Sequence, residues 1–363
     1  MKTVKVLVLT KYGPLGASSR MRALQYLPWF EKAGLQVTVQ PLLSDELLQS
    51  SYSNGGYRHH HLLQAYAMRL RVLLKCQDFD VVWIEKEALP WFPLWLELTL
   101  LRGVPYVLDY DDAVFHNYDR HGNYLVRRLY GCRLDGLMTR SALVVGGNNY
   151  LAQRAHNAGA KWVETLPTVI DLDRYPIKKR MQPLTAGLDS VPRIVWIGSP
   201  STARYLKLLG EPLRALAARK SFVLRVIGGG AVELPGVQLE ILPWKEHTEV
   251  DDISACDVGI MPLLDSPWEK GKCGYKLIQY MACGLPVVAS NVGVNPEIVQ
   301  HGENGFLANQ PHEWVSALEQ LLESQSLRTK MGMKGRQQVE QKYCIQQTGP
   351  KLVGFLRAAS KVS

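Results

Sequence analysis

The chain has 363 residues, of which 47% are hydrophobic and 21% are charged, and it carries a formal net charge of +9. This length exceeds one ordinary hydrophobic core and predicts two domains, and the composition excludes a disordered or fibrous chain. The positive charge, most of it in residues 1–190, suits a polyanionic partner but does not choose among a nucleotide, a membrane surface and a nucleic acid.

The six cysteines show no Cys-x-x-Cys spacing. This pattern favours reduced thiols in the cytosol over a disulfide framework or a zinc site. The sequence begins MKTVKVLVLT, which predicts a first strand and not a signal peptide. We therefore expect a cytoplasmic protein.

An apolar strand at residues 4–10, a helix at residues 20–33 and a second strand form a predicted β-α-β unit at the start of the chain. The loop at residues 11–19 follows the first strand, and open α/β sheets bind ligands at the carboxyl ends of their strands. Gly16 lets the backbone of this loop approach a ligand closely. The alternative is an ordinary tight turn with a solvated Arg20.

Two segments before residue 102 are unusual in composition. Residues 50–61 read SSYSNGGYRHHH and are predicted to form a solvated loop, because three consecutive histidines do not share a helix face for a metal. Residues 88–101 are apolar but short and interrupted by prolines, so they cannot span a bilayer. They predict a half-buried helix or, alternatively, a contact with a membrane surface through Trp91, Phe92 and Trp95.

Two further strands place polar side chains at the same sheet edge. The strand at residues 80–85 leads into Lys86, and the strand at residues 104–112 ends in the sequence DYDD. Three roles stay open for the second group: binding of sugar or acceptor hydroxyl groups by Asp111 or Asp112, helix capping, and binding of a divalent metal.

Residues 172–191 lack periodicity and contain prolines and glycines, which predicts a linker. A second α/β domain begins with a strand at residues 193–197. Residues 266–290, SPWEKGKCGYKLIQYMACGLPVVAS, then divide into a glycine-rich turn, a short helix and a buried strand. A glycine turn at a helix start exposes backbone N–H groups, and Lys272 and Lys276 lie within one turn of it. This segment is predicted to bind phosphate.

The sequence at residues 274–308, GYKLIQYMACGLPVVASNVGVNPEIVQHGENGFLA, closely resembles the donor-binding segment of retaining nucleotide-sugar glycosyltransferases of the GT-B fold, the family that includes sucrose synthases and bacterial cell-surface mannosyltransferases. The resemblance implies an α/β protein with two facing Rossmann-like domains, an interdomain cleft and a C-terminal helix that crosses back to the first domain. We expect an acceptor-side domain at residues 1–187, a donor domain at 188–343 and the crossing helix at 344–363.

The same resemblance implies roles for individual residues. The catalytic candidates are Arg204, Lys272, Lys276 and Asp111. The donor-binding candidates are Gly16, Gly198, Ser199, Trp244, Glu269, Gly271, Cys273, Gly274, Tyr275, Leu277 and Gln279. The acceptor-side candidates are Ser18, Ser19, Arg20, Asp112 and His116.

The sequence departs from the family pattern at several of these positions. Ser199 occupies the place of an arginine that clamps the diphosphate, and Gly271 and Gln279 occupy the places of two glutamates. Glu269 lies two residues from the first of these and is the candidate to replace it. Asp111 stands where the family often has a histidine.

The resemblance implies a retaining, metal-independent sugar transfer from a nucleotide-diphosphate sugar to a saccharide or lipid-linked acceptor, in cell-surface glycan or lipopolysaccharide biosynthesis. No resident cofactor and no nucleic-acid partner are expected, and peripheral contact with the cytoplasmic membrane face is one expectation. The alternatives are a nucleotide-sugar epimerase of the same fold and a non-catalytic scaffold that binds nucleotide sugars.

Overall fold

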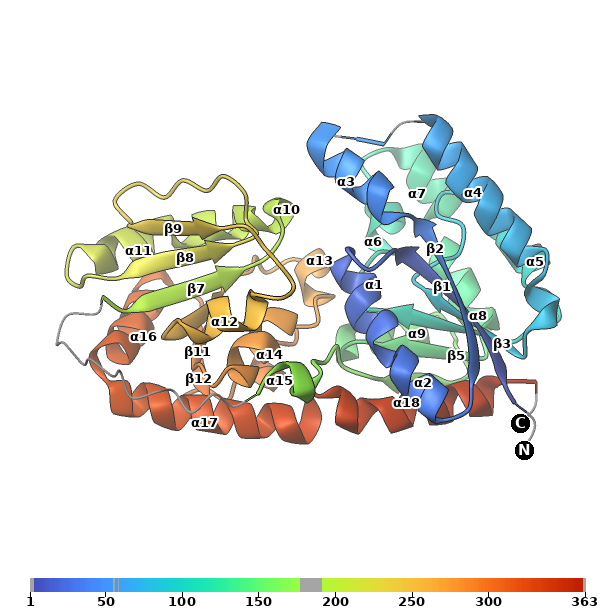
Figure 1. Ribbon diagram of the computed structural model, residues 1–363. Helices are drawn as coiled ribbons and strands as arrows, with labels where there is room; N and C mark the ends of the chain where they lie inside the picture. The colour runs from blue at the N-terminus through green and yellow to red at the C-terminus, as the bar shows by residue number, and fades with distance from the viewer. Residues whose placement is uncertain (1–2, 55, 58, 177–190, 362–363) are drawn as a thin grey trace. The chain divides into compact units, whose positions relative to one another are not determined.

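The computed structural model describes residues 3–54, 56–57, 59–176 and 191–361, which form two compact units (Figure 1). The first unit comprises Met1–Thr168, Lys270–Cys273 and Ile345–Ser363, and the second comprises Val169–Glu269 and Gly274–Cys344. The chain thus passes between units at Thr168, whereas the sequence analysis sets the boundary at residue 187. Of the predicted linker, residues 177–190 lie outside the described residues.

The first unit contains a six-stranded sheet in the order β2-β1-β3-β4-β5-β6, in which every pairing is parallel. Its strands are β1 (Lys5–Tyr12), β2 (Gln36–Leu43), β3 (Val81–Glu85), β4 (Tyr106–Tyr110), β5 (Leu143–Gly146) and β6 (Val163–Thr165). The central strands are continuously buried, as expected for a parallel sheet covered on both faces. The strand order reverses between β1 and β3, and ligands bind at such switch points.

Helices cover both faces of this sheet (Figure 1). They are α1 (Ala17–Arg22), η1 (Leu24–Tyr26), α2 (Leu27–Lys32), α3 (Asp45–Asn54), α4 (His59–Leu73), η2 (Cys76–Asp78), α5 (Leu94–Leu100), α6 (His116–Asp119), α7 (Tyr124–Tyr130), α8 (Arg133–Arg140), α9 (Asn149–Asn157) and α18 (Ile345–Ala359). Helix α18 joins the first unit through a hydrogen bond between Thr348 and Tyr26 and through the approach of Gly349 to Trp29.

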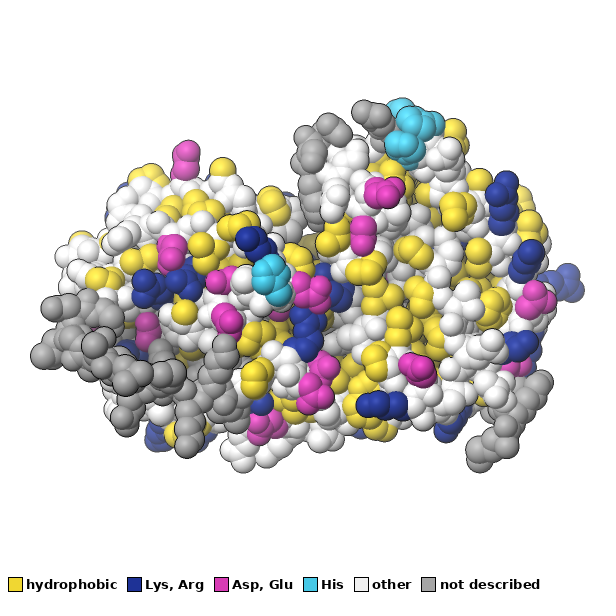
Figure 2. Space-filling model, viewed as in Figure 1, with side chains coloured by type: hydrophobic (Ala, Val, Ile, Leu, Met, Phe, Trp, Pro, Cys, Tyr) yellow, Lys and Arg dark blue, Asp and Glu magenta, His cyan; other side chains and the backbone are white. Residues whose placement is uncertain are grey.

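Two local predictions in this unit are wrong. The single helix expected at residues 20–33 is broken into α1, η1 and α2, and Pro28 stands in the first turn of α2, where its missing N–H is harmless. The loop expected at residues 50–61 is largely helical, because α3 continues to Asn54 and α4 begins at His59. Figure 2 shows histidine side chains at the surface where α4 begins.

The second unit contains a six-stranded parallel sheet in the order β12-β11-β10-β7-β8-β9. Its strands are β7 (Arg193–Ile197), β8 (Val223–Ile227), β9 (Leu239–Leu242), β10 (Val258–Met261), β11 (Val287–Ser290) and β12 (Gly305–Ala308). This is the strand order of the dinucleotide-binding Rossmann fold, with its switch point between β7 and β10.

The helices of the second unit are η3 (Leu172–Arg174), α10 (Pro200–Ala203), η4 (Arg204–Leu209), α11 (Gly210–Ala217), α12 (Glu249–Ser254), α13 (Pro267–Lys270), α14 (Tyr275–Ala282), α15 (Asn295–Ile298), α16 (Pro311–Glu323) and α17 (Gln325–Lys342). Residue Lys270, which ends α13, belongs to the first unit.

Strand β7 shows how the second sheet is buried on both faces. Ile194 and Trp196 belong to one hydrophobic cluster, and Val195 and Ile197 belong to another. Successive side chains of a strand point to opposite faces, so these two clusters are the two layers of core that cover the sheet. With both faces covered, the loops at the carboxyl ends of the strands are left for ligands.

Candidate functional site

Polar side chains gather at the switch point of the first sheet, where β1, β3 and β4 end. Glu85 is buried at the end of β3 and accepts hydrogen bonds from the hydroxyl groups of Ser18 and Ser19 and from the backbone N–H of Lys11. Both serines lie in α1, which directly follows the loop after β1. Glu85 therefore fixes that loop against the neighbouring strand.

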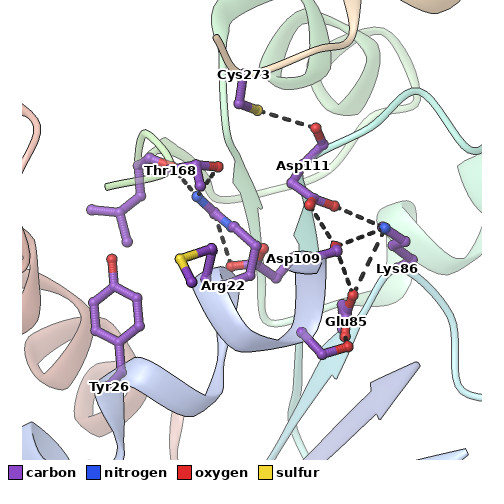
Figure 3. A network of polar contacts seen from close by, with 12 residues as sticks. Arg22, Tyr26, Glu85, Lys86, Asp109, Asp111, Thr168 and Cys273 are labelled. Atoms are coloured by element: carbon purple, nitrogen blue, oxygen red, sulfur yellow. Dashed lines mark hydrogen bonds and ion pairs between the residues drawn. The ribbon is translucent and has the colours of Figure 1, made fainter. Parts of the chain in front are cut away.

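Lys86 is a buried cation between two carboxylates of this cluster (Figure 3). Its Nζ lies 3.0 Å from Asp111 Oδ1 and 3.7 Å from Glu85 Oε1, and it donates to Ser18 Oγ at 2.9 Å. The backbone of Lys86 has φ = 67°, a conformation that is uncommon for residues other than glycine. Such strain persists only where the surrounding contacts fix it, and it is concentrated at functional sites.

The charges of this cluster determine its protonation. Burial alone would raise the pKa of Asp111, but the charge of Lys86 and the hydrogen bond from Ser18 outweigh it, so the pKa lies below its ordinary value. Burial would likewise lower the pKa of Lys86, but Asp111 and Glu85 raise it above the ordinary value. Asp111 and Lys86 are therefore both charged at neutral pH.

Arg22 and Asp109 form a second buried ion pair beside this cluster (Figure 3). The guanidinium donates to both carboxylate oxygens, at 2.7 Å and 3.0 Å, and also to the backbone oxygen of Leu166 at 2.7 Å. This two-point geometry holds α1 to the end of β4 and to the segment after β6. Arg22 helps to set the geometry of the site, because its guanidinium N–H groups donate to residues of its own unit.

Residues 270–273 return to the first unit and lie against the loop after β4. Lys272 Nζ lies 3.2 Å from Asp112 Oδ1, and the Cys273 thiol donates to the backbone oxygen of Asp111 at 3.2 Å. Asn148 donates to the backbone oxygens of Lys270 and Lys272. Burial raises the pKa of Cys273 to about 12, so this thiol stays protonated and serves structure.

Gly271 lets this segment pass close to Ala113. A Cβ atom at Gly271 would lie 2.5 Å from Ala113 Cβ and 2.6 Å from its backbone N, closer than real contacts allow. Position 271 therefore requires glycine, because a side chain there would collide with Ala113.

In the second unit, α14 places its first turn beside the loop after β7. Gly274 has φ = 65° and precedes α14. Lys276 reaches back over the sheet edge, with its Nζ 5.3 Å from the Trp196 ring centroid, and a Cβ atom at Gly198 would lie 2.9 Å from Lys276 Cε. The glycine after β7 and the lysine of α14, which are far apart in sequence, are neighbours at this switch point.

Tyr280 anchors α14 at the same point. Its hydroxyl accepts from the N–H of Ile197 at 3.0 Å and donates to the backbone oxygen of Ile260 at 3.4 Å, which joins it to β7 and β10. A Cβ atom at Gly259 would meet the Tyr280 ring at 2.3 Å, so glycine in β10 leaves room for the ring. The packing of Tyr280 sets the height of α14 above the sheet.

Two hydrogen-bonded groups flank this switch point. Glu269 is buried and accepts from the Tyr205 and Ser266 hydroxyls, while the exposed Arg204 donates to the Tyr205 hydroxyl at 3.3 Å and lies 5.2 Å from its ring centroid. In the second group, Glu249 accepts from Trp244 at 2.6 Å and from Tyr175 at 2.8 Å, and Gln279 donates to Tyr175 at 3.3 Å.

The comparison with known families concerns the region that contains this second switch point. Residues 191–324 match the family of glycosyl transferases group 1.

Curated proteins are similar to the chain over short segments. The N-acetyl-alpha-D-glucosaminyl L-malate synthase of Bacillus anthracis is 35% identical over 77 residues, which is 21% of this chain and 20% of that protein. The D-inositol 3-phosphate glycosyltransferase of Pseudarthrobacter chlorophenolicus is 31% identical over 129 residues, 35% of this chain and 28% of that protein. The matches thus span between a fifth and a third of these relatives.

Solved structures are similar over nearly the whole length. HepE of Anabaena, in complex with UDP-glucose, superposes with a TM-score of 0.71 at 15% identity and covers 98% of this chain and 99% of its own. Sucrose-phosphate synthase of Thermosynechococcus elongatus gives a TM-score of 0.71 at 14% identity, with 98% of each chain covered. These likenesses confirm the predicted GT-B fold of two Rossmann-like domains.

The structure gathers the predicted glycosyltransferase residues into distinct groups. In the first unit, the residues that lie together are Ser18, Ser19, Asp111, Asp112, Lys272 and Cys273. In the second unit, they are Gly198, Ser199, Gly274, Tyr275 and Lys276. Gly16 begins α1, where a Cβ atom would strike Tyr12.

Four other candidates have their polar groups or side chains engaged inside their own unit. Both ring nitrogens of His116 are hydrogen-bonded, one to Asp119 and the other to Tyr150. Arg20 donates to the backbone oxygen of Pro14 at 2.8 Å. The Leu277 side chain is fully buried in the core, and Gln279 is buried with Tyr175 as its partner.

Sequence reasoning missed several residues of the two switch points as candidates: Arg22, Glu85, Tyr175, Tyr205 and Glu249. Only Glu85 carried a local signal, since it ends a strand at the ligand-binding edge. The others act through partners that are distant in sequence.

We predict that Lys86→Met destabilises the protein by about 3–5 kcal/mol at pH 7, because it leaves the buried Asp111 and Glu85 without their shared cation. Because the pKa of Asp111 is lowered in the folded protein, this carboxylate stabilises the fold at pH values above the pKa that it has in the unfolded chain. That stability is lost as the pH falls through the lowered pKa. In the Lys86→Met variant, by contrast, a proton taken up by the cluster relieves the repulsion between the carboxylates of Asp111 and Glu85. The stability deficit should therefore shrink between pH 7 and pH 5, as measured by urea unfolding.

The matched control is Lys161→Met, because Lys161 is exposed. Its stability should change by less than about 0.5 kcal/mol at either pH. A deficit for Lys86→Met that is the same at both pH values would contradict the assignment of Lys86 as the cation of this cluster.

We also predict that Gly271→Ala lowers the free energy of unfolding by about 1–3 kcal/mol, because the new methyl group meets the backbone of Ala113. Gly122→Ala is the control, since a Cβ atom there meets nothing within 4 Å. Thermal unfolding of the two variants measures the difference. Equal melting temperatures would show that residues 270–273 do not lie against Ala113.

Proposed function

We propose that the protein is a retaining glycosyltransferase that moves a sugar from a nucleotide-diphosphate sugar to a saccharide or lipid-linked acceptor, in the biosynthesis of cell-surface glycan or lipopolysaccharide. The observation that carries this proposal is the meeting of Gly198 and Lys276 at the switch point of a unit whose residues 191–324 match glycosyl transferases group 1. The metal-independent form of the reaction belongs to the same proposal.

The donor diphosphate is assigned to the second unit. The first turn of α14 offers the positive end of the helix dipole. Lys276 stands in that turn, and Arg204 is the first residue of η4, which follows α10 after the loop of β7. Both cations lie against aromatic rings, Lys276 against Trp196 and Arg204 against Tyr205.

The acceptor is assigned to the cluster at the first switch point. Ser18 has one hydroxyl hydrogen, but carboxylate oxygens of both Glu85 and Asp111 lie within hydrogen-bond distance of its Oγ. When Ser18 donates to Glu85, Asp111 Oδ2 lacks that donor. A sugar hydroxyl group can supply it, so Asp111 is suited to orient an acceptor hydroxyl.

In the transfer itself, the acceptor oxygen forms a bond to the anomeric carbon as the bond from that carbon to the diphosphate breaks. The departing diphosphate takes the acceptor's hydroxyl proton on the same face of the sugar, so the configuration is retained and no protein nucleophile is consumed. Lys276 and Arg204 stabilise the charge that develops on the diphosphate, while Asp111 orients the acceptor.

The donor assignment predicts that one of the UDP-, GDP-, TDP- and ADP-sugars raises the melting temperature of the purified protein, because a ligand of the native state stabilises it. HepE, which shares the fold, binds UDP-glucose, so UDP-glucose is the first compound to test. The shift should persist with EDTA. A shift that needs a divalent ion would contradict the metal-independent proposal.

Lys276→Ala should lower turnover with that donor by at least about 10²-fold, as expected for the loss of a residue that stabilises leaving-group charge. Turnover is measured as release of nucleoside diphosphate. Lys207→Ala is the control, because Lys207 is an exposed lysine of η4. Unchanged turnover in Lys276→Ala would remove this lysine from the site, and hydrolysis without any acceptor would favour the epimerase alternative.

The acceptor assignment predicts a different effect for Asp111→Asn. This variant keeps the size of the side chain but removes the charge that accepts the hydroxyl hydrogen, so acceptor-dependent turnover should fall by about 10-fold to 10²-fold. The donor-induced shift in melting temperature should be unchanged. A loss of donor binding in Asp111→Asn would show that Asp111 serves the donor instead.

A further inference from the structure

Lys11 is a half-buried cation near the carboxyl end of β1. Its backbone N–H donates to Glu85 Oε2 at 2.9 Å, which fixes the residue at the first switch point. The side-chain Nζ lies 5.3 Å from the centroid of the Tyr12 ring. Among the described residues, no carboxylate forms an ion pair with this Nζ. Folding therefore removes part of the water around the Lys11 ammonium without supplying a counter-ion.

The neighbouring buried cations are arranged differently. Lys86 lies 3.0 Å from Asp111, and Arg22 makes a two-point contact with Asp109. A cation taken out of water destabilises the fold unless a partner offsets the lost hydration, and these two cations have such partners. Within the described residues Lys11 has no such carboxylate, so the stability of the unit does not explain a lysine at this position.

The charges around Lys11 favour an added anion. Burial lowers the pKa of the Lys11 ammonium below its ordinary value, and the charge of Lys86 lowers it further. Glu87 and Glu85 act in the opposite direction but do not restore the pKa. Each of these carboxylates already has a cation of its own, because Glu87 pairs with Arg133 and Glu85 lies 3.7 Å from Lys86. An anionic ligand group beside Lys11 would thus supply the charge that its surroundings lack.

Tyr12 joins Lys11 to the rest of this switch point. Its backbone N–H donates to Ser19 Oγ at 3.0 Å. Burial raises the pKa of its hydroxyl group, and the carboxylates of Asp111 and Asp112 add to this rise. A carboxylate acts in this way only over a short distance, so the hydroxyl lies near these two residues. In the part of the chain that the structure describes, the Tyr12 hydroxyl forms no hydrogen bond, so it can serve a ligand.

We propose that Lys11 and Tyr12 extend the acceptor site and that the acceptor carries an anionic group, a carboxylate or a phosphate, which binds the Lys11 ammonium. The reacting hydroxyl group lies at Asp111, and the ring and hydroxyl of Tyr12 contact the sugar between these two points. This inference rests on the proposed function, because it takes Asp111 as the place of the acceptor hydroxyl. A neutral acceptor of the same shape should bind about tenfold more weakly, as expected for the loss of one charge-assisted hydrogen bond.

The anionic group has two chemical sources. It is either the carboxylate of an acidic sugar or the phosphate that joins a saccharide to a lipid. In the second case the acceptor lies at a membrane surface, and the described residues contain no helix that is both long and apolar enough to cross that membrane. Both sources place negative charge beside the sugar, so Lys11 suits either, and the experiment distinguishes them.

The first measurement observes Lys11 directly and does not depend on sugar transfer. The full chain is acetylated with acetic anhydride, and mass spectrometry gives the rate at each lysine with and without methyl glucuronide or glucose 1-phosphate. At least one of these probes should slow acetylation of Lys11 by about threefold or more, because a bound anion raises the pKa of the amine and covers it. Methyl glucoside, the neutral counterpart, should leave the rate unchanged.

Lys5 is the internal control, because it is an exposed lysine of the same strand. Its rate should not respond to any probe. Protection by methyl glucuronide alone assigns the anionic group to an acidic sugar, and protection by glucose 1-phosphate alone assigns it to a phosphate. No protection of Lys11, equal protection by methyl glucoside, or equal slowing at Lys5 would overturn the proposal.

The second measurement concerns transfer from the donor, with the protecting probe and methyl glucoside as acceptors. Lys11→Gln should raise the KM for the anionic acceptor by about tenfold and leave kcat and the KM for methyl glucoside within about twofold. Lys11→Arg should restore most of the affinity, and Tyr12→Phe should raise the KM for both acceptors alike. Lys5→Gln is the matched control and should leave both KM values unchanged.

The two measurements separate this inference from the proposed function. An equal rise in KM for both acceptors in Lys11→Gln would overturn the anionic group as the partner of Lys11. Protection of Lys11 by an anionic probe, with no nucleoside diphosphate released from any donor, would confirm the anion site and contradict glycosyl transfer. The melting temperature of Lys11→Gln should not fall, because the substitution leaves no carboxylate without its cation.

Discussion

The buried ammonium group of Lys86 is the interaction on which the first switch point depends. Removing a lysine from water is unfavourable by several kcal/mol, and here two carboxylates, Asp111 and Glu85, and the Ser18 hydroxyl offset that loss. Glu85 in turn holds both serines of α1 and the backbone of the loop after β1. One cation thus links three segments whose strands are neighbours in the sheet but distant in sequence.

The second switch point is built by packing more than by charge. Tyr280 inserts its ring over Gly259 and bonds to β7 and β10, and this fixes where α14 begins relative to Gly198. The left-handed backbone at Gly274 lets the helix start sharply there. The core of the unit thereby holds the first turn of α14, which contains Lys276, in place at the edge of the sheet.

The α/β class of the chain could be predicted because its signals are local, whereas the GT-B fold was predicted from the resemblance of residues 274–308. Continuous apolar strands followed by glycine or polar loops predict parallel sheets with ligands at the carboxyl edge, and both switch points lie there. The pairing of Arg22 with Asp109 could not be predicted, because it joins residues 87 positions apart through burial. The break in the first helix did have a local signal, because Pro28 stands in the first turn of α2.

Partners that are distant in sequence also explain why the roles of individual side chains were harder to predict than the positions of these residues at the sheet edges. Gln279 occupies the place expected for a ribose contact, yet its amide donates to Tyr175, a residue that no local pattern connects to it. His116 likewise has both ring nitrogens occupied by Asp119 and Tyr150. The residue type at a position limits the chemistry that its side chain can perform. The buried partners of that side chain decide whether it can still contact a ligand.

The partners of the cations bear on the proposed assignment of the acceptor to the first unit. At the first switch point Arg22, Lys86 and Lys272 each face a carboxylate, so their charge is neutralised within the unit and an added phosphate would meet Asp111 and Asp112. At the second, Arg204 lies against the ring of Tyr205 and Lys276 lies against the ring of Trp196. Neutral hydroxyl groups therefore fit the first cluster better than a phosphate does, which agrees with the proposed assignment of the acceptor to the first unit.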